Sequence, residues 1–583
     1  MYRLYGSQIL RRLRERFERL YGNAADLCLK RVIMMVGRYG QGIEAPGPGP
    51  LWDQTDALLI TYPDMLNTLG ERPLRTLHRF LRERLRDSFS IVHILPFFPF
   101  SADDGFAIED FRNVRPGLGD WDDIHRIGED FSLMFDLVLN HVSRHHPWIK
   151  DYLEGIAPAR DFFIETDPTE DLSLVVRPRS TPLLTRLPTN RGARYLWTTF
   201  GSQQIDLNFA NPDVLFEFLD LLLHYVRHGA RIIRLDAVAY VWKKPGTACI
   251  HLPETHELVR LFRDFLGICA PRTILLTETN VPQRENLSYF GEGDEAHMVY
   301  QFSLPPLLLH GLLRGSARRL TEWAKALPEP PPRCTWLNFT ASHDGIGLRP
   351  AEDLLAEEEI SFLVRHCRKQ GGRITTRSRP DGSESAYELN ITYFDAMGTG
   401  ESSPVAQRRK VLRFLCSQVI SMELRGVPAV YFNSLVAATN DLERVKKMGY
   451  ARAINRTKWQ ERELLHRLST RRSVQQVFRS ITHALRIRRQ RAAFHPDAYQ
   501  KVLDFGDEIF AVERTAPDGK ESVLCLSNVT GRRQVVHLGR NRQHDFRGGP
   551  WRCALSERPR GHHDRVGLAP YETVWLVRGR SPE

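Results

Sequence analysis

Short apolar runs alternate with amphipathic helical patterns through most of this chain. Eight runs have the length and the branched or aromatic content of buried strands: residues 57–61, 91–95, 133–139, 232–236, 274–278, 297–301, 336–339 and 429–432. Strands separated by helices indicate parallel βα units, and eight strands close a (β/α)8 barrel. The pattern therefore predicts an α/β protein built on a TIM barrel.

Other patterns lie before, within and after these repeats. Residues 7–21 and 25–38 predict helices, and 42–50 is rich in Gly and Pro, as linkers are. Two connections are too long for ordinary loops and predict insertions, 143–205 and 345–392, that wall one end of the barrel. After a helix near 473–491, short strands follow one another. We predict an N-terminal helical extension (1–52), a barrel domain (53–494) and a C-terminal all-β domain (495–583).

The charge of the chain narrows the class of partner. The 583 residues carry a formal net charge of +11. Most basic residues are arginines beside acidic ones, as in 79–87, without a stripe of interleaved aromatics, so we do not expect nucleic acid as a partner. An anionic small substrate suits this charge better. No apolar run approaches the roughly 20 residues of a membrane span, so no membrane partner is expected.

The eight cysteines are scattered along the chain without paired spacing. This distribution argues against a zinc site or a disulfide framework and predicts reduced thiols in a cytoplasmic protein. The N-terminus also lacks the basic-then-apolar order of a signal peptide.

Three carboxylates lie at or near the ends of separate predicted strands. Asp236 and Glu278 end two of the apolar runs, and Asp344 follows a third. Arg234 shares a strand face with Asp236, because side chains alternate along a strand. Carboxylates at the carboxyl ends of barrel strands are typical of a barrel active site, and a pair with a third acid suits glycosyl chemistry. We therefore expect an enzyme.

Four short segments identify a family. Asp136-Leu-Val-Leu-Asn-His141, Arg234-Leu-Asp-Ala-Val238, Glu278 and Ser342-His-Asp344 resemble, in this order, the signatures of the α-amylase superfamily, glycoside hydrolase family 13. Residues 93–106, 301–310, 343–347 and 452–456 are similar to the sucrose phosphorylase subgroup. Within it, 277–280, 293–300 and 381–390 look most like glucosylglycerate phosphorylases, where sucrose phosphorylases tend to have Glu-Val-His in place of Glu278-Thr-Asn280.

The resemblance implies roles for individual residues. Asp236 matches the nucleophile, Glu278 the general acid/base and Asp344 the acid that stabilises the transition state. The residues expected to bind or orient the glucosyl unit are Asp103, Phe106, His141, Phe200, Gln204, Arg234, His343 and Arg452. Among them, Asp103 and Arg452 match an ion pair that closes the glucose pocket.

Three further residues match or depart from the acceptor and phosphate site of the subgroup. Arg179 and Tyr387 match phosphate-handling residues on the two insertions. Glu388 stands where sucrose phosphorylases usually have Gln, and Ser385 where they have Asp. These departures argue against sucrose as the natural substrate. Asn140 matches a calcium ligand of many amylases, but the phosphorylase subgroup does not depend on that ion, so we expect no metal and no other cofactor.

The resemblance implies a retaining phosphorylase with small-molecule partners, a glucoside and inorganic phosphate. We expect reversible phosphorolysis of 2-O-α-D-glucosyl-D-glycerate to α-D-glucose 1-phosphate and D-glycerate. Phosphorylases of glucosylglycerol, sucrose 6-phosphate or sucrose are close alternatives, and an α-glucosidase or transglucosidase is a more distant one. Whether the chain forms a homodimer is left open.

Overall fold

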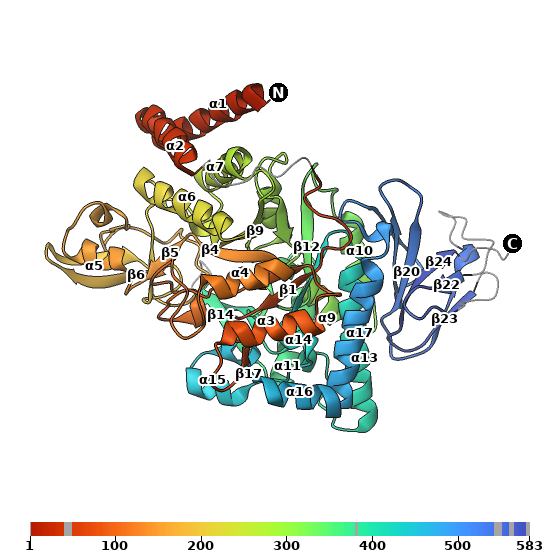
Figure 1. Ribbon diagram of the computed structural model, residues 1–583. Helices are drawn as coiled ribbons and strands as arrows, with labels where there is room; N and C mark the ends of the chain where they lie inside the picture. Colours follow the sequence, from red (N-terminus) through yellow and green to blue (C-terminus); the bar gives the residue numbers. More distant parts are fainter. Residues whose placement is uncertain (1, 40–48, 379–382, 541–550, 559–564, 579–583) are drawn as a thin grey trace.

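A closed barrel of eight parallel strands forms the centre of the protein (Figure 1). The structure is a computed structural model that describes residues 2–39, 49–378, 383–540, 551–558 and 565–578. The barrel strands are β1 (Leu58–Thr61), β3 (Ile91–Ile94), β4 (Ser132–Val138), β9 (Ala230–Asp236), β10 (Ile274–Thr277), β11 (Met298–Tyr300), β12 (Thr335–Phe339) and β16 (Val427–Tyr431). All eight predicted strands are confirmed within one or two residues, and the predicted (β/α)8 fold is correct.

The barrel strands are buried almost throughout, because helices cover the outside and side chains fill the inside. This double burial explains why each strand reads as a continuous apolar run. The principal helices around it are α3 (Pro73–Arg84), α4 (Trp121–Asp130), α6 (Pro212–Arg227), α7 (Pro253–Cys269), α9 (Leu304–Arg314), α10 (Arg318–Ala326), α13 (Pro404–Glu423) and α17 (Arg472–Arg488).

The two long connections fold into small structures of their own. The first contains β5 (His141–Ser143), α5 (Pro147–Leu153), β6 (Leu184–Thr189), β7 (Gly192–Trp197) and β8 (Gln204–Asp206). The second contains β13 (Ile346–Gly347), α11 (Glu357–Lys369), β14 (Arg373–Ser378) and β15 (Glu384–Asn390), whose strands form one antiparallel sheet. Each connection leaves a strand at its carboxyl end, so both reach the same face of the barrel.

An N-terminal helical hairpin packs beside α6 and α7 (Figure 1). It consists of α1 (Tyr2–Tyr21) and α2 (Ala25–Tyr39). The helix α1 begins before the expected start, and the buried apolar residues on its inner face are Ile9, Leu13 and Phe17, spaced one turn apart. The linker predicted over 42–50 lies largely outside the described residues.

The C-terminal part is an antiparallel β structure against α13 and α17 (Figure 1). Its main sheet contains β18 (Tyr499–Leu503), β19 (Ile509–Thr515), β20 (Ser522–Asn528), β24 (Thr573–Arg578) and β22 (Trp551–Cys553), and β21 (Gln534–His537) pairs with β23 (Arg565–Leu568). The all-β class predicted for this region is confirmed, while the domain limits remain predictions.

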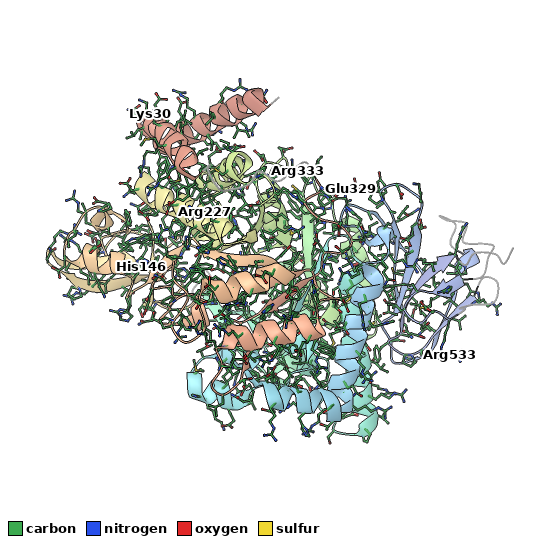
Figure 2. All side chains as sticks on the ribbon, in the orientation of Figure 1. Lys30, His146, Arg227, Glu329, Arg333 and Arg533 are labelled. Carbon is green, nitrogen blue, oxygen red and sulfur yellow. The ribbon has the colours of Figure 1, made fainter. Side chains whose placement is uncertain are left out.

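The positive charge is spread over the outer surface. Lys30 on α2 and Arg227 at the end of α6 are exposed at one end of the molecule, and the exposed Arg533 lies far from both (Figure 2). No helix among the described residues is long and apolar enough to span a membrane.

Candidate active site

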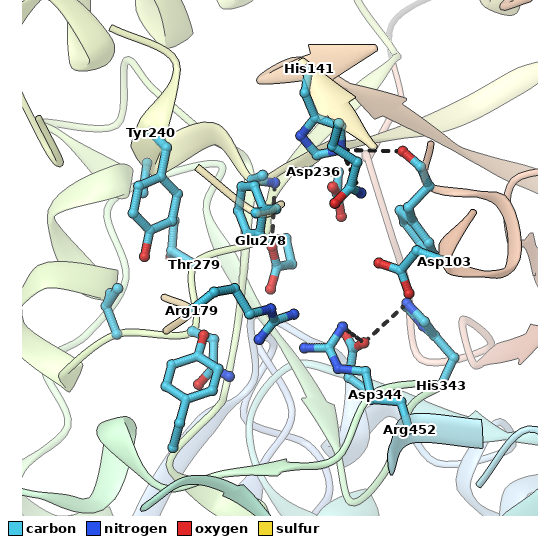
Figure 3. Close-up of a pocket in the computed structure, with 18 residues that line it drawn as sticks. Asp103, His141, Arg179, Asp236, Tyr240, Glu278, Thr279, His343, Asp344 and Arg452 are labelled. Atoms are coloured by element: carbon cyan, nitrogen blue, oxygen red, sulfur yellow. Dashed lines mark hydrogen bonds and ion pairs between the residues drawn. The ribbon is translucent and has the colours of Figure 1, made fainter. Parts of the chain in front are cut away.

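The three predicted carboxylates meet in one pocket at the carboxyl ends of the barrel strands (Figure 3). Asp236 is the last residue of β9, Glu278 follows β10, and Asp344 stands on the loop after β12. All other predicted site residues except Arg234 and Glu388 line the same pocket: Asp103, Phe106, His141, Arg179, Phe200, Gln204, His343, Tyr387 and Arg452. The fold therefore brings together residues that are far apart in the sequence.

Arg234 lies beneath the pocket and holds Asp236. Its Nη1 donates to Asp236 Oδ1 at 2.5 Å and also to Asp136 on the neighbouring strand β4. Asp136 in turn contacts His93 Nε2 at 2.8 Å. Because all these side chains are buried, Arg234 and Asp236 are fixed in orientation as well as in charge.

Among the described residues, no cation is in direct contact with Glu278. Its Oε2 accepts a hydrogen bond from the Ala237 amide at 3.3 Å. Burial raises the pKa of both Glu278 and Asp236, and the proximity of the two carboxyls prevents both from ionising easily. The Arg234 guanidinium favours charge on Asp236. If the pair shares one proton, the Arg234 contact therefore favours that proton on Glu278 and the negative charge on Asp236, which are the states that a general acid and a nucleophile need.

Asp344 is surrounded by cations. Its Oδ1 lies 2.5 Å from Arg452 Nη1 and 3.5 Å from Arg456 Nη2. Burial alone would raise the pKa of Asp344, but the guanidinium groups of Arg452 and Arg456 hold it below its ordinary range. Asp344 is therefore ionised.

The predicted ion pair between Asp103 and Arg452 is not formed. Asp103 instead pairs with Arg456 at 3.2 Å. The Arg452 guanidinium pairs with Asp344 and Glu388. The fully buried Arg456 pairs with both Asp103 and Asp104. Arg456, four residues after Arg452, thus takes the place beside Asp103 that was predicted for Arg452.

Aromatic rings and neutral histidines form the pocket walls. The Phe106 ring stacks on His343 with centroids 4.8 Å apart. His141 Nε2 lies 3.1 Å from the Phe106 carbonyl oxygen and 3.0 Å from Gln204 Nε2. Burial lowers the pKa of His141 to about 4, and that of His343 also falls. Both rings are therefore neutral hydrogen-bonding groups near pH 7.

Residues from the two insertions meet on another side of the pocket. Arg179 from the first insertion and Tyr387 on β15 both line it, and the Arg179 Cζ lies 5.7 Å from the Tyr387 ring centroid. Tyr240 and Thr279 also line it (Figure 3). Asn280 is a third lining residue that was not predicted, and its Oδ1 has no hydrogen-bond partner.

The missed residues carry a weak sequence signal. Tyr240 follows Asp236 by one turn, and Thr279 and Asn280 directly follow Glu278. Position on a loop after a barrel strand is therefore the feature that could have identified them.

Glu388 is placed behind Arg452 and does not line the pocket. Its two carboxylate oxygens accept from Arg452 Nε and Nη2, each at 3.0 Å. The predicted acceptor-site residue thus contacts a residue of the predicted glucose site.

The surroundings of Asn140 do not fit a calcium ion. The Lys243 ammonium donates to Asn140 Oδ1 and lies 2.9 Å from Asp206 Oδ2. A protein cation therefore already lies against the oxygen that would bind the metal. Within the described parts of the chain, no three His, Cys, Asp or Glu side chains are arranged to hold a metal ion.

Comparisons with known proteins agree with this architecture. Residues 88–318 match the family described as alpha amylase, catalytic domain. Glucosylglycerate phosphorylases from Allomeiothermus silvanus and Escherichia coli are 44% and 42% identical to this chain, over 96% and 90% of its length and 97% and 92% of theirs. The crystal structure of sucrose 6F-phosphate phosphorylase from Thermoanaerobacter thermosaccharolyticum superposes with a TM-score of 0.71 at 26% identity, covering 84% of this chain and 96% of that one. The chain belongs to glycoside hydrolase family 13, in the group formed by the glucosylglycerate phosphorylases and their sucrose phosphorylase relatives.

Proposed function

We propose that this enzyme catalyses the reversible phosphorolysis of 2-O-α-D-glucosyl-D-glycerate to α-D-glucose 1-phosphate and D-glycerate. The observation that carries the proposal is one pocket that holds an Arg234-bound Asp236, the carboxyl of Glu278 and the guanidinium of Arg179. The similarity to glucosylglycerate phosphorylases over nearly the whole chain supports the choice of acceptor.

The two carboxylates carry the reaction in two displacements. In the first, an Asp236 oxygen bonds to the anomeric carbon, the glycosidic bond breaks, and Glu278 gives its proton to the departing glycerate oxygen. In the second, a phosphate oxygen bonds to the same carbon, the Asp236 ester breaks, and Glu278 recovers a proton from the phosphate. Two inversions return the α configuration.

The remaining pocket residues stabilise the bound sugar and its transition state. Asp344, held ionised by its arginines, stabilises the positive charge that develops at the glucosyl ring. The neutral rings of His141 and His343 contribute hydrogen bonds to sugar hydroxyls. Phe106 and Phe200 provide apolar faces on either side.

Arg179 is the group that favours phosphate over water as the second nucleophile. A guanidinium makes forked hydrogen bonds to an oxyanion, and the hydroxyls of Tyr387 and Tyr240 lie in the same pocket. Since phosphate and the glycerate carboxylate are both anions, one cationic site serves each in turn.

Measurement of phosphate release from α-D-glucose 1-phosphate tests the proposal. D-Glycerate, glycerol, fructose and fructose 6-phosphate are compared as acceptors, and D-glycerate should give the highest rate by a wide margin. Preference for another member would reassign the acceptor to that of a glucosylglycerol, sucrose or sucrose 6-phosphate phosphorylase. Glucose release without any dependence on acceptor or phosphate would identify a hydrolase instead.

We also propose that the enzyme works in the cytoplasm, since all eight cysteines are free thiols. No cofactor enters the proposed reaction. Light scattering coupled to size-exclusion chromatography would measure whether the chain forms a homodimer.

A further inference from the structure

Glu388 is a fully buried carboxylate next to the proposed glucose site. Its side chain is 0% exposed and lies on β15, one residue after Tyr387. The pairing of β15 with β14 is irregular here, because Glu388 pairs with Thr375 and Ala386 with Thr376, which leaves Tyr387 as an extra residue. Tyr387 lines the pocket, while Glu388 reaches Arg452 from outside the pocket lining.

Arg452 forms a bridge between two carboxylates. Its Nη1 lies 2.5 Å from Asp344, and its Nε and Nη2 donate to the two oxygens of Glu388. All three nitrogens of the Arg452 guanidinium therefore contact a carboxylate oxygen. Such a paired contact fixes the plane of the group as well as its position.

The loop after Asp344 leaves space for this contact. A Cβ atom on Gly345 would lie 2.6 Å from Glu388 Cγ, and Gly347 pairs with Glu388 across the sheet. The backbone that follows Asp344 is thus packed directly against Glu388. A side chain at position 345 would displace it.

We propose that Glu388 is a positioning residue of the glucose site, which orients Arg452 toward Asp344 and has no part in choosing the acceptor. It also ties the second insertion, which carries Tyr387, to the glucose end of the pocket. This inference rests on the proposed glucosyl transfer, but it is independent of which acceptor the enzyme prefers.

A glutamine in this place would not hold Arg452 in the same way. Its amide offers one oxygen acceptor, and its NH2 group would face a guanidinium N–H, donor against donor. The charge that balances the second half of the Arg452 guanidinium would also disappear. Loss of one charge-assisted hydrogen bond corresponds to about a 10- to 100-fold change in rate.

Two assays separate the glucose site from the acceptor site. Fluoride release from α-D-glucosyl fluoride reports transfer to Asp236 without an acceptor, and phosphate release from α-D-glucose 1-phosphate is measured with the acceptor panel. Glu388→Gln should lower kcat/KM about 10- to 100-fold in both assays and leave the acceptor ranking unchanged. The matched control is Glu384→Gln, an exposed residue on the same strand, which should behave as wild type.

The double variant Glu388→Gln with Arg452→Lys tests whether Glu388 affects the rate through Arg452. If Glu388 acts through Arg452, the double variant should be no worse than Arg452→Lys alone. Glu388→Asp, which keeps the charge, should retain more activity than Glu388→Gln and provides the same comparison if the Gln variant does not fold.

A changed acceptor ranking with normal fluoride release would overturn the inference, as would rates equal to those of the Glu384 control. Absence of phosphate release with every acceptor would instead contradict the proposed function. In that case fluoride release still decides the role of Glu388, so the two failures are distinguishable.

Discussion

At the scale of single residues, the proposed chemistry depends on where one proton lies. Asp236 and Glu278 occupy neighbouring barrel strands and share a buried environment, yet only Asp236 is bonded to a guanidinium. The Ala237 amide, next to Asp236, donates to Glu278. A single peptide unit thereby links the two carboxyls and keeps their relative position constant.

Replacement of Glu278 by Gln tests this division of roles. The variant should lose phosphorolysis of glucosylglycerate by about 10²- to 10⁴-fold, because it cannot protonate the departing oxygen. It should retain much more fluoride release from α-D-glucosyl fluoride, since fluoride leaves without a proton. Equal losses in both assays would contradict the assignment of Glu278 as the acid.

The pH dependence follows from the same assignment. Burial raises the pKa of Glu278, so the wild-type kcat/KM for phosphorolysis should fall as pH rises through a value above the ordinary Glu range near 4.3. Fluoride release by Glu278→Gln should lack this alkaline decline. A decline at the same pH in both enzymes would assign it to another group.

At the scale of elements, the loop after β9 has a fixed cation beneath the pocket. The Lys243 side chain is 2% exposed and contacts Asn140 and the fully buried Asp206. Lys243→Met should lower the free energy of unfolding by about 3–5 kcal/mol, because it leaves Asp206 buried without its cation. Urea titration would measure this loss, with the exposed neighbour Lys244→Met as the control.

Since Lys243 already contacts Asn140, removal of divalent ions should leave catalysis unaffected. Phosphorolysis after dialysis against EDTA is expected at the rate of the untreated enzyme. A loss that calcium restores would show that an ion has a place near Asn140 after all.

The sequence predicts the barrel well because each strand is buried on both sides and needs an apolar run. The carboxylates were predictable for a related reason, since Asp236 and Glu278 end such runs. The partner of Asp103 was not predictable, because the choice between Arg452 and Arg456 depends on where the tertiary structure places each arginine. Tyr240 and Asn280 follow barrel strands in segments without hydrophobic periodicity, so only their position after a strand marks them.

At the scale of the whole molecule, buried charges attach the N-terminal hairpin to the barrel. Arg16, on α1, donates to Asp264 at 2.6 Å and to Glu257 at 3.0 Å, both on α7. Tyr21 then reaches the Phe209 carbonyl oxygen and packs near Trp242, on the loop that follows β9. The hairpin therefore supports the outer side of the loop that carries Tyr240.

Arg16→Met tests the contribution of this attachment. It should cost about 3 kcal/mol, seen as a lower onset of thermal unfolding in calorimetry, because two buried carboxylates lose a shared partner. Arg11→Met, on the exposed face of the same helix, should change stability by less than about 0.5 kcal/mol. Equal effects of the two substitutions would argue against a specific role for the buried cluster.

The contact between Glu388 and Arg452 has a consequence for the evolution and engineering of specificity. Loops on a barrel rim are usually exchangeable modules, because the strands beneath them keep their own shape. Here the second insertion shares Arg452 with Asp344, on the loop after β12, so it is not an independent module. A segment transplanted from a sucrose phosphorylase, with Gln in place of Glu388, would lack the carboxylate that pairs with Arg452. Recombination between these enzymes should therefore succeed only where both residues of that contact come from the same parent.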